Sequence, residues 1–181
     1  MRSIMAACAQ ADYPAEISMV LSNRADSKGL AFAKENGIPT EYVDHKAYET
    51  REEFEDEIQD RLKNYDIDLI VLAGFMRILT GSFVEQWPDQ IINIHPSLLP
   101  DYKGLHTHER AINDGKTEAG CTVHFVIPDL DSGPIIAQNR VPILKGDTPK
   151  TLSARVLEQE HLIYPEAIKL LAASSQKTSR T

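Results

Sequence analysis

The sequence predicts a three-layer α/β fold, with a mostly parallel, Rossmann-like sheet, helices on both faces and an antiparallel strand near the C-terminal end. Three observations support this fold class. Short runs rich in valine and isoleucine alternate along the chain with amphipathic stretches of helical length. Most of these runs are almost uninterruptedly apolar, as in strands that helices cover on both sides. One later run instead alternates between apolar and polar residues, which is typical of an outer strand.

Four runs are predicted to be strands because they are rich in valine and isoleucine and end at Asn, Gly or Pro. In chain order they are residues 16–22, 68–74, 91–94 and 121–127. Residues 135–143 are a fifth candidate, in which apolar and polar residues alternate and Pro142 lies near the end. This pattern predicts an outer strand, antiparallel and close to residues 121–127.

Amphipathic stretches of helical length lie between these strands. The predicted helices are residues 28–36, 51–64, 80–87 and 106–114. Residues 148–173 are predicted to close the fold as a longer helix, because Thr148 is a suitable cap and Pro149 suits a first helical turn. Pro165 should kink or restart this helix, since proline cannot donate a backbone hydrogen bond.

The beginning of the chain is an exception to the alternation. Met1, Ile4, Met5 and Cys8 have the i, i+3, i+4, i+7 spacing of a helix that faces a core. No predicted strand precedes this helix. A chain that opens inside a βα unit lacks the strand and turn with which such a unit normally starts.

The composition bounds the class of protein. The chain has 181 residues, of which 42% are hydrophobic, and this length suits one domain with a sizeable core. We expect this domain to cover residues 1–173, and we expect residues 174–181 to form a flexible tail because they contain no apolar anchor. Residues 44–68 hold ten acidic and four basic residues, which predicts a solvated helix face.

Charge and hydropathy also exclude several partners. The net charge of -8 argues against the broad basic surface that binds nucleic acid. No apolar run is long enough for a membrane span, and the N-terminus lacks the pattern of a signal peptide. We therefore predict a cytoplasmic protein that binds neither nucleic acid nor a membrane. Cys8 and Cys121 do not lie in a motif of metal-binding spacing and are expected in the core.

Candidate catalytic residues follow the predicted strands, because ligands of an open parallel sheet bind beyond the carboxyl ends of its strands. Alternation along residues 91–94 and the next residue puts Asn93 and His95 on the same side. An asparagine amide can donate to a developing oxyanion, and a histidine can exchange a proton near neutral pH. The pair therefore suits proton transfer at an electrophilic carbon. A histidine that merely satisfies hydrogen bonds at a strand end is an equal alternative.

Further polar residues lie in neighbouring segments. Asp129 and Asp131 occupy a loop bounded by Pro and Gly, and a carboxylate beside His95 would favour the imidazolium. The same Asp pattern is more often only an Asx turn. His106 and His108 form an HxH motif, but residues two apart on a helix do not share a face, so we predict no metal site.

Six motifs together resemble one enzyme family. They are LAGFMRIL, NIHPSLLP, GLHTH, VHFV, DLDSGP and ARVLEQEH. From residue 1 to about residue 173 the chain resembles the phosphoribosylglycinamide formyltransferase family, the folate-dependent enzymes of purine biosynthesis. NIHPSLLP alone is also similar to methionyl-tRNA formyltransferases and formyltetrahydrofolate hydrolases. GLHTH directly after it favours the glycinamide enzymes.

The resemblance implies transfer of a formyl group from 10-formyltetrahydrofolate to the amine of glycinamide ribonucleotide, without a metal. It implies that the catalytic residues are Asn93, His95 and Asp131. It implies folate contacts at Arg51, Met76, Arg77, Ile78, Leu79 and Asn93. It implies substrate contacts at Pro96, Leu157, Glu158, Gln159 and Glu160. A homodimer is compatible with the sequence.

The sequence departs from the family pattern at two places. The family has a first strand and a Gly/Ser/Asn-rich loop whose backbone amides cradle the substrate phosphate, and neither precedes Met1. We expect either a start at an internal Met or a truncated chain. Lys103 stands where the family often has Pro. Two interpretations are open: the lysine is an extra cation that helps to hold phosphate, or it is a neutral substitution in a loop. Two alternative functions follow: a folate-binding homologue impaired in transfer, and a formyltetrahydrofolate hydrolase.

Overall fold

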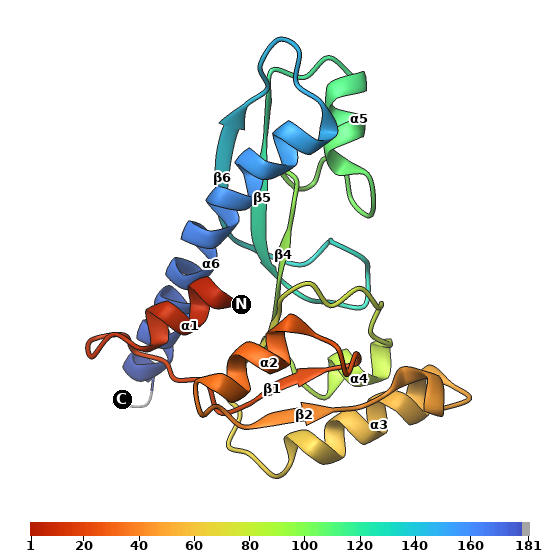
Figure 1. The fold of residues 1–181 in the computed structure, drawn as a ribbon, viewed down its shortest axis with the longest axis vertical. Helices are drawn as coiled ribbons and strands as arrows, with labels where there is room; N and C mark the ends of the chain where they lie inside the picture. The colour runs from red at the N-terminus through yellow and green to blue at the C-terminus, as the bar shows by residue number, and fades with distance from the viewer. Residues whose placement is uncertain (179–181) are drawn as a thin grey trace.

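The computed structural model describes residues 1–178. All the predicted helices and strands are present in the predicted order, with helices between most strands (Figure 1). In chain order the elements are α1 (Arg2–Cys8), β1 (Val20–Ser22), α2 (Lys28–Glu35), β2 (Thr40–Tyr42), the 3-10 helix η1 (His45–Ala47), α3 (Arg51–Leu62), β3 (Ile70–Leu72), α4 (Gly81–Glu85), β4 (Ile91–His95), α5 (Thr107–Asn113), β5 (Glu118–Phe125), β6 (Ile135–Pro142) and α6 (Pro149–Thr178).

The strands form two hydrogen-bonded ladders. β1 pairs with β2 in parallel, and a four-stranded sheet has the order β3-β4-β5-β6. Within that sheet β3 and β4 are parallel, whereas β5 is antiparallel to both β4 and β6. The α/β class and the antiparallel β6 are therefore confirmed. The sheet is more evenly mixed than the predicted mostly parallel one.

The direction of β5 explains this difference. The connection from β4 to β5 contains α5, and we expected such a helix to cross one face of the sheet and return a parallel strand. Instead β5 starts at the carboxyl end of β4, where His95 pairs with Thr122, and runs back beside it. α5 accordingly lies near the beginning of β5 (Figure 1).

Helices cover both faces of the larger sheet, as predicted. One core cluster joins α6 and α1 to β4, β5 and β6, and includes Ile92, Val123 and Leu152. A second cluster joins α3 and α4 to β4 and includes Phe54 and Ile91. Neighbouring residues of β4 therefore enter opposite cores, because successive side chains of a strand point to opposite faces.

The ends of the chain differ from expectation in part. The predicted first helix is present as α1, with Ile4 and Met5 buried. α6 continues through Pro165, whose carbonyl oxygen accepts a hydrogen bond of 2.6 Å from the Tyr13 hydroxyl, so the helix does not restart there. α6 also extends to Thr178, which makes the first part of the expected tail helical. Residues 179–181 of that tail lie outside the described residues.

Two short elements were absent from the sequence prediction, namely β2 and η1. β2 has three residues, too few for an alternation to be recognised, and it is held by its ladder with β1. β1 is shorter than predicted and begins at Val20 instead of residue 16. The strand propensity of residues 16–19 led us to predict a longer strand. The observed length is set instead by the three residue pairs that β1 forms with β2.

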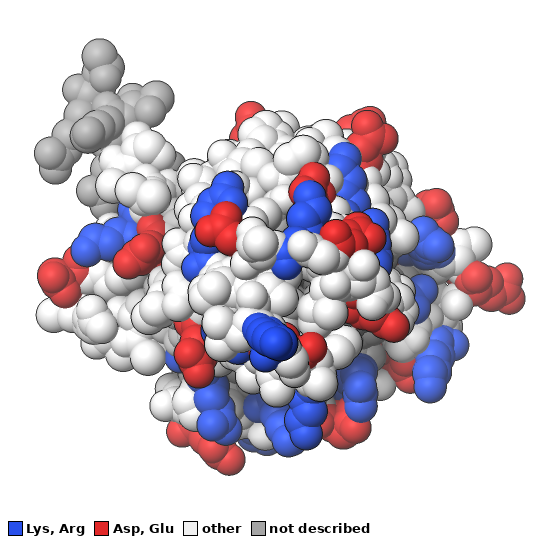
Figure 2. All heavy atoms as spheres, turned by 90° about the horizontal axis from the view of Figure 1, so that it is seen from above, with Lys and Arg blue, Asp and Glu red and all other residues white. Residues whose placement is uncertain are grey.

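Both cysteines are free, and Cys121 is fully buried. Burial raises the pKa of the Cys121 thiol to about 12. Within residues 1–178 no helix is both long and apolar enough to span a membrane. Figure 2 shows Lys and Arg side chains interspersed with Asp and Glu on the face viewed from above.

Tyr164 joins α6 to the two parallel strands β3 and β4, and a variant of this residue tests the contact. Its buried hydroxyl lies 2.7 Å from the Leu72 carbonyl oxygen and 3.2 Å from that of Ile92. Tyr164→Phe should lower the free energy of unfolding by about 1–3 kcal/mol, because a buried acceptor loses its donor. Urea denaturation measures this change. Tyr65→Phe, which removes a more exposed hydroxyl, is the control; equal losses in the two variants would contradict the assignment.

Candidate active site

The antiparallel pairing of β4 with β5 builds the centre of the site. Asn93 on β4 lies opposite His124 on β5 in this pairing. The His124 Nδ1–H donates to the Phe125 carbonyl oxygen over 2.8 Å, which leaves Nε2 as an acceptor. The Asn93 amide nitrogen lies 3.5 Å from that Nε2. One Asn93 N–H is thus oriented by His124, and the second remains for another acceptor.

Asp131 reaches this centre from the loop between β5 and β6, residues 126–134. Its carboxylate oxygen Oδ2 lies 3.3 Å from His95 Nδ1 and accepts a hydrogen bond of 2.8 Å from the Gly104 backbone N–H. The other oxygen lies 3.8 Å from His124 Nε2. The side chains of His95 and Asp131 are each only 7% exposed, so water screens their interaction little. The structure therefore brings together an imidazole that the sequence placed at the end of a strand and a carboxylate that it placed on a separate loop.

Gly133 is required for this loop path. A β-carbon at Gly133 would collide with the Phe125 carbonyl oxygen, so only glycine lets the loop lie against β5. Asp131 itself has a positive φ of 47°, which aspartate adopts more readily than most residues. The loop is thus folded back tightly enough to aim Asp131 at His95.

Both nitrogens of the His95 ring have partners. Nδ1 faces Asp131, and Nε2 lies 2.9 Å from the Tyr102 carbonyl oxygen. Both partners are acceptors, so only the protonated ring can donate to the two of them at once. Both ring nitrogens of His95 therefore face an oxygen acceptor. His95 thus has the hydrogen-bond partner expected of a structural histidine as well as the neighbouring carboxylate that a catalytic role would need, and its catalytic role stays a prediction.

His124 was not predicted to contribute to the site. Burial lowers its pKa, and the Asp131 carboxylate offsets only part of this effect. His108 is half-buried beside the site, and burial together with the charge of His95 lowers its pKa as well. The strand register with Asn93 was the signal that would have identified His124, and it could not be derived before the direction of β5 was known.

The loop that follows β4 is fixed by buried polar contacts. The Thr122 hydroxyl donates to the Ser97 carbonyl oxygen over 2.7 Å and accepts from the Leu99 N–H over 3.1 Å. Gln138 on β6 donates to the same hydroxyl and to the Leu99 carbonyl oxygen. Pro96, a predicted substrate contact, is half-buried at the start of this loop.

The predicted folate contacts of residues 76–79 include apolar side chains that face solvent. Met76 is 78% exposed and Ile78 is 54% exposed, whereas Leu79 packs against the second core. Leu105 and Leu130, on the two loops that carry the site, are also exposed. Exposed apolar groups on all three loops suit a flat aromatic ligand. Arg51 begins α3, and Arg77 lies over the Phe54 ring of that helix, 5.8 Å from its centroid.

The other four predicted substrate residues lie on α6. Gln159 accepts a hydrogen bond of 3.2 Å from Asn139 on β6. Glu160 is half-buried, and burial raises the pKa of its carboxyl group. Leu157 and Glu158 are exposed. The structure places these four residues on one helix, but their role toward a substrate stays a prediction.

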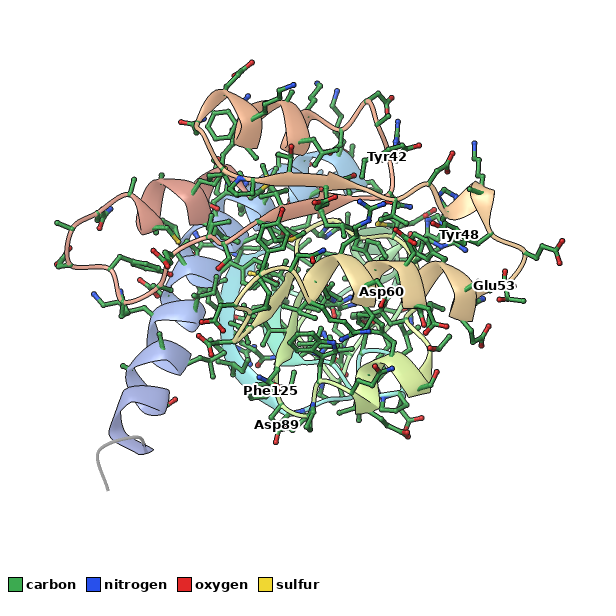
Figure 3. All side chains as sticks on the ribbon, turned by 90° about the horizontal axis from the view of Figure 1, so that it is seen from below. Tyr42, Tyr48, Glu53, Asp60, Asp89 and Phe125 are labelled. Carbon is green, nitrogen blue, oxygen red and sulfur yellow. The ribbon has the colours of Figure 1, made fainter. Side chains whose placement is uncertain are left out.

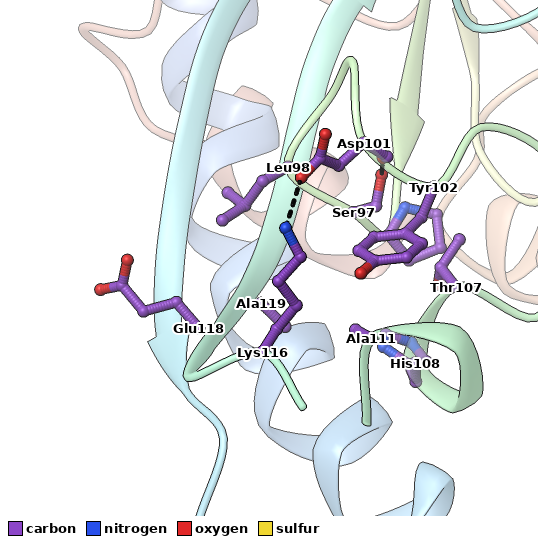
Figure 4. A pocket seen from close by; sticks show the side chains of 11 residues that line it. Ser97, Leu98, Asp101, Tyr102, Thr107, His108, Ala111, Lys116, Glu118 and Ala119 are labelled. Atoms are coloured by element: carbon purple, nitrogen blue, oxygen red, sulfur yellow. Dashed lines mark hydrogen bonds and ion pairs between the residues drawn. The ribbon is translucent and has the colours of Figure 1, made fainter. Parts of the chain in front are cut away.

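A cavity of about 30 Å³ lies behind the loop that follows β4 (Figure 4). The Lys116 ammonium group lies 3.3 Å from the Asp101 carboxylate on its wall. His108 Nδ1 is buried near this cavity without a hydrogen-bond partner. The volume suits a water molecule and is too small for a folate or a sugar phosphate.

Lys103 joins the loop that follows β4 to the loop between β5 and β6. Its ammonium group donates to the Ser132 hydroxyl over 2.7 Å, next to Asp131 in the chain. His106, by contrast, is exposed and lies 3.7 Å from Glu109. Within residues 1–178 no group of three His, Cys, Asp or Glu side chains is arranged to hold a metal ion.

This geometry agrees with a comparison of the whole chain with known proteins. A sequence model described as formyl transferase matches residues 1–168. The chain belongs to the formyl transferase family. It is 46% identical over 169 residues to phosphoribosylglycinamide formyltransferase of Haemophilus influenzae, which covers 93% of this chain and 80% of that protein.

Two further relatives connect the family to the observed fold. The crystal structure of phosphoribosylglycinamide formyltransferase from Brucella melitensis superposes with a TM-score of 0.91 at 47% identity, covering 96% of this chain and 89% of that one. The trifunctional purine biosynthetic protein adenosine-3 of Homo sapiens is 50% identical over 161 residues, or 89% of this chain. The chain spans only 16% of the length of that trifunctional relative. The formyl transferase fold is thus shared at high identity.

The pKa of His124 tests the arrangement of the site. We expect NMR titration of its ring to give a midpoint below the ordinary value of 6.5, because burial disfavours the charged ring. The folded state then binds fewer protons than the unfolded state, so this histidine's stabilising contribution is lost as the pH falls from about 6.5 toward the folded midpoint. A midpoint above 6.5 would show that Asp131 outweighs burial and that His124 is a cation at the site.

Proposed function

We propose that the protein transfers a formyl group from 10-formyltetrahydrofolate to the amine of glycinamide ribonucleotide, a step of purine biosynthesis. The observation that carries this proposal is the cluster of Asn93, His95 and Asp131, with a 3.3 Å separation between the imidazole and the carboxylate. Such a cluster can stabilise an oxyanion and move a proton without a covalent intermediate. The shared name of two relatives, at 46% and 47% identity, supports the substrate assignment.

The residues around the cluster fit a folate. Met76, Ile78, Leu105 and Leu130 are exposed apolar side chains on the loops that surround the cluster. They can cover the flat faces of a pterin and a benzoyl ring, while Arg51 or Arg77 can neutralise an anionic tail. We infer folate contacts at Arg51, Met76, Arg77, Ile78, Leu79 and Asn93, and substrate contacts at Pro96, Leu157, Glu158, Gln159 and Glu160.

The co-substrate supplies the formyl carbon that the amine attacks. Asn93 holds one amide N–H toward His124, so its other N–H can donate to the formyl oxygen as negative charge develops there. The protonated His95 ring adds positive charge beside the same oxygen. Asp131 faces that ring over 3.3 Å and offers a carboxylate oxygen through which a proton of the attacking amine can move toward the departing nitrogen.

The compartment is part of the proposal. Two free cysteines, of which Cys121 is buried, are compatible with the reducing conditions of a cytoplasm. We therefore infer a cytoplasmic enzyme whose ligands are the two small molecules named above.

Steady-state kinetics with and without glycinamide ribonucleotide test the proposed reaction. We expect turnover of 10-formyltetrahydrofolate only when the amine is present, with one formylated product formed for each folate released. Formate release that does not depend on the amine would instead identify a hydrolase. Folate binding without either reaction would identify a binding protein.

Removal of the imidazole tests the role of His95. His95→Ala should nearly abolish turnover while the dissociation constant for tetrahydrofolate stays close to that of the parent protein, because the ring acts on the reacting atoms and not on the pterin. Stopped-flow transfer and equilibrium binding measure the two quantities. Activity within a few-fold of the parent would overturn this role.

Removal of the amide tests Asn93 separately. Asn93→Ala should lower kcat by about 10²–10³, the effect of losing one oxyanion donor. The exposed Asn36→Ala, at the carboxyl end of α2, is the matched control and should leave kcat unchanged. An equal effect in the two variants would mean that Asn93 does not act on the reacting oxygen.

A further inference from the structure

Glu55 is a buried acid that the chemistry above does not use. It lies on α3 with only 4% of its surface exposed, within the acidic stretch that the sequence predicted to be solvated. One carboxylate oxygen accepts a hydrogen bond of 2.9 Å from the Thr80 backbone N–H, and the other contacts the Thr80 hydroxyl. None of the ion pairs within residues 1–178 includes Glu55. Burial of an acid without a cation is costly, so both contacts with Thr80 must offset that cost.

Glu55 completes the cap of a different helix. In a capping box the N-cap hydroxyl accepts from the third helical residue, whose Glu side chain accepts in return from the N-cap N–H. α3 has a complete box of this kind, made by Thr50 and Glu53. In α4 the Thr80 hydroxyl accepts a hydrogen bond from the Phe83 backbone N–H, but the Phe83 side chain has no carboxylate that could accept from the Thr80 N–H. Glu55 on α3 supplies the carboxylate oxygen that accepts from the Thr80 N–H instead.

Thr80 is also the last residue of the loop that presents the exposed Met76 and Ile78. This loop, residues 74–80, contacts α3 at a second point, where the Arg77 guanidinium lies over the Phe54 ring. The Phe54 ring also contacts the rings of Tyr48 and His45, at centroid distances of 6.1 and 6.2 Å. Figure 3 shows Tyr48 and Glu53 at the same end of α3. The loop is thus attached to α3 at two points, at Arg77 in the middle of the loop and at Thr80 at its end.

We propose that Glu55 is a positioning residue for the folate contacts: it fixes Thr80, and with it the path of residues 74–80, so that Met76 and Ile78 face the co-substrate. This inference rests on the proposed function, because it assigns the folate to that loop. The alternative is that Glu55 only stabilises the short helix α4. The positioning role predicts that loss of Glu55 weakens folate binding more than an equal loss of stability elsewhere does. The purely stabilising role predicts no such excess.

Three variants of the full chain separate these possibilities. Glu55→Ala removes both contacts with Thr80. Glu55→Gln keeps an acceptor for the Thr80 N–H and a similar volume. Ser27→Ala removes the N-cap of α2 and serves as the matched control, because it also costs one helix cap but lies outside the loops of the site.

Hydrogen exchange of the ligand-free variants tests the attachment itself. We expect the amides of residues 75–82 to exchange faster in Glu55→Ala than in the parent protein, and to be unchanged in Glu55→Gln and Ser27→Ala. This measurement involves no folate, so its outcome does not depend on the proposed function. Unchanged exchange in Glu55→Ala would overturn the proposed attachment.

Affinity and turnover then test the consequence. For Glu55→Ala we expect the dissociation constant of tetrahydrofolate and the KM for 10-formyltetrahydrofolate to rise at least about tenfold, as a misplaced binding loop would cause. At saturating folate kcat should stay within about threefold, because Asn93, His95 and Asp131 are untouched. Glu55→Gln should restore the affinity to within about twofold of the parent.

Two results would contradict the proposal. An unchanged dissociation constant in Glu55→Ala, despite faster exchange of residues 75–82, would show that the loop does not hold the folate. An equal rise in Ser27→Ala would show that stability alone is responsible. If the parent protein binds tetrahydrofolate without transferring a formyl group, the proposed function fails, while the exchange and binding measurements still decide the role of Glu55.

Discussion

The site depends on the antiparallel pairing of β4 with β5. Because β5 runs back along β4, His124 lies opposite Asn93. The loop that leaves β5 then returns toward the end of β4, where Asp131 lies near His95. Gly133 lets that returning loop lie against β5, and Asp131 then reaches His95. A parallel β5 would carry its carboxyl end to the same edge as that of β4 and would lose the facing pair. The chemistry therefore follows from the direction of one strand.

The three loops of the site are each held by a buried polar contact to a neighbouring element. Thr122 fixes the loop after β4, and the Gly104 N–H joins that loop to the Asp131 carboxylate. Glu55 fixes the end of the loop after β3. The Gly104–Asp131 contact lies directly next to the exposed Leu105 and Leu130 in the chain, so it also restricts the backbone that carries these side chains. Such an arrangement preorganises the polar groups and leaves the surface that a flat ligand would cover accessible.

The sequence allowed the fold class and part of the site to be predicted. Alternation along β4 sufficed to put Asn93 and His95 on one side, and helical spacing sufficed for α1 and α3. The contact of His95 with Asp131 could not be derived, because it depends on how a loop of nine residues folds back. The direction of β5 was predicted wrongly, because the long connection before it can return the chain either parallel or antiparallel to β4. Glu55 was expected in solvent because only tertiary packing against α4 distinguishes it from the other acids of that stretch.

The most direct test of the account is the single-turnover rate of formyl transfer by Asp131→Asn, compared with Asp129→Asn. Asp129 is an exposed carboxylate in the same loop, so this variant controls for loss of charge near the site. We expect Asp131→Asn to lower the rate by about 10²–10⁴, the usual contribution of a positioned acid or base, and Asp129→Asn to keep the parent rate. Equal rates in the two variants would contradict this expectation.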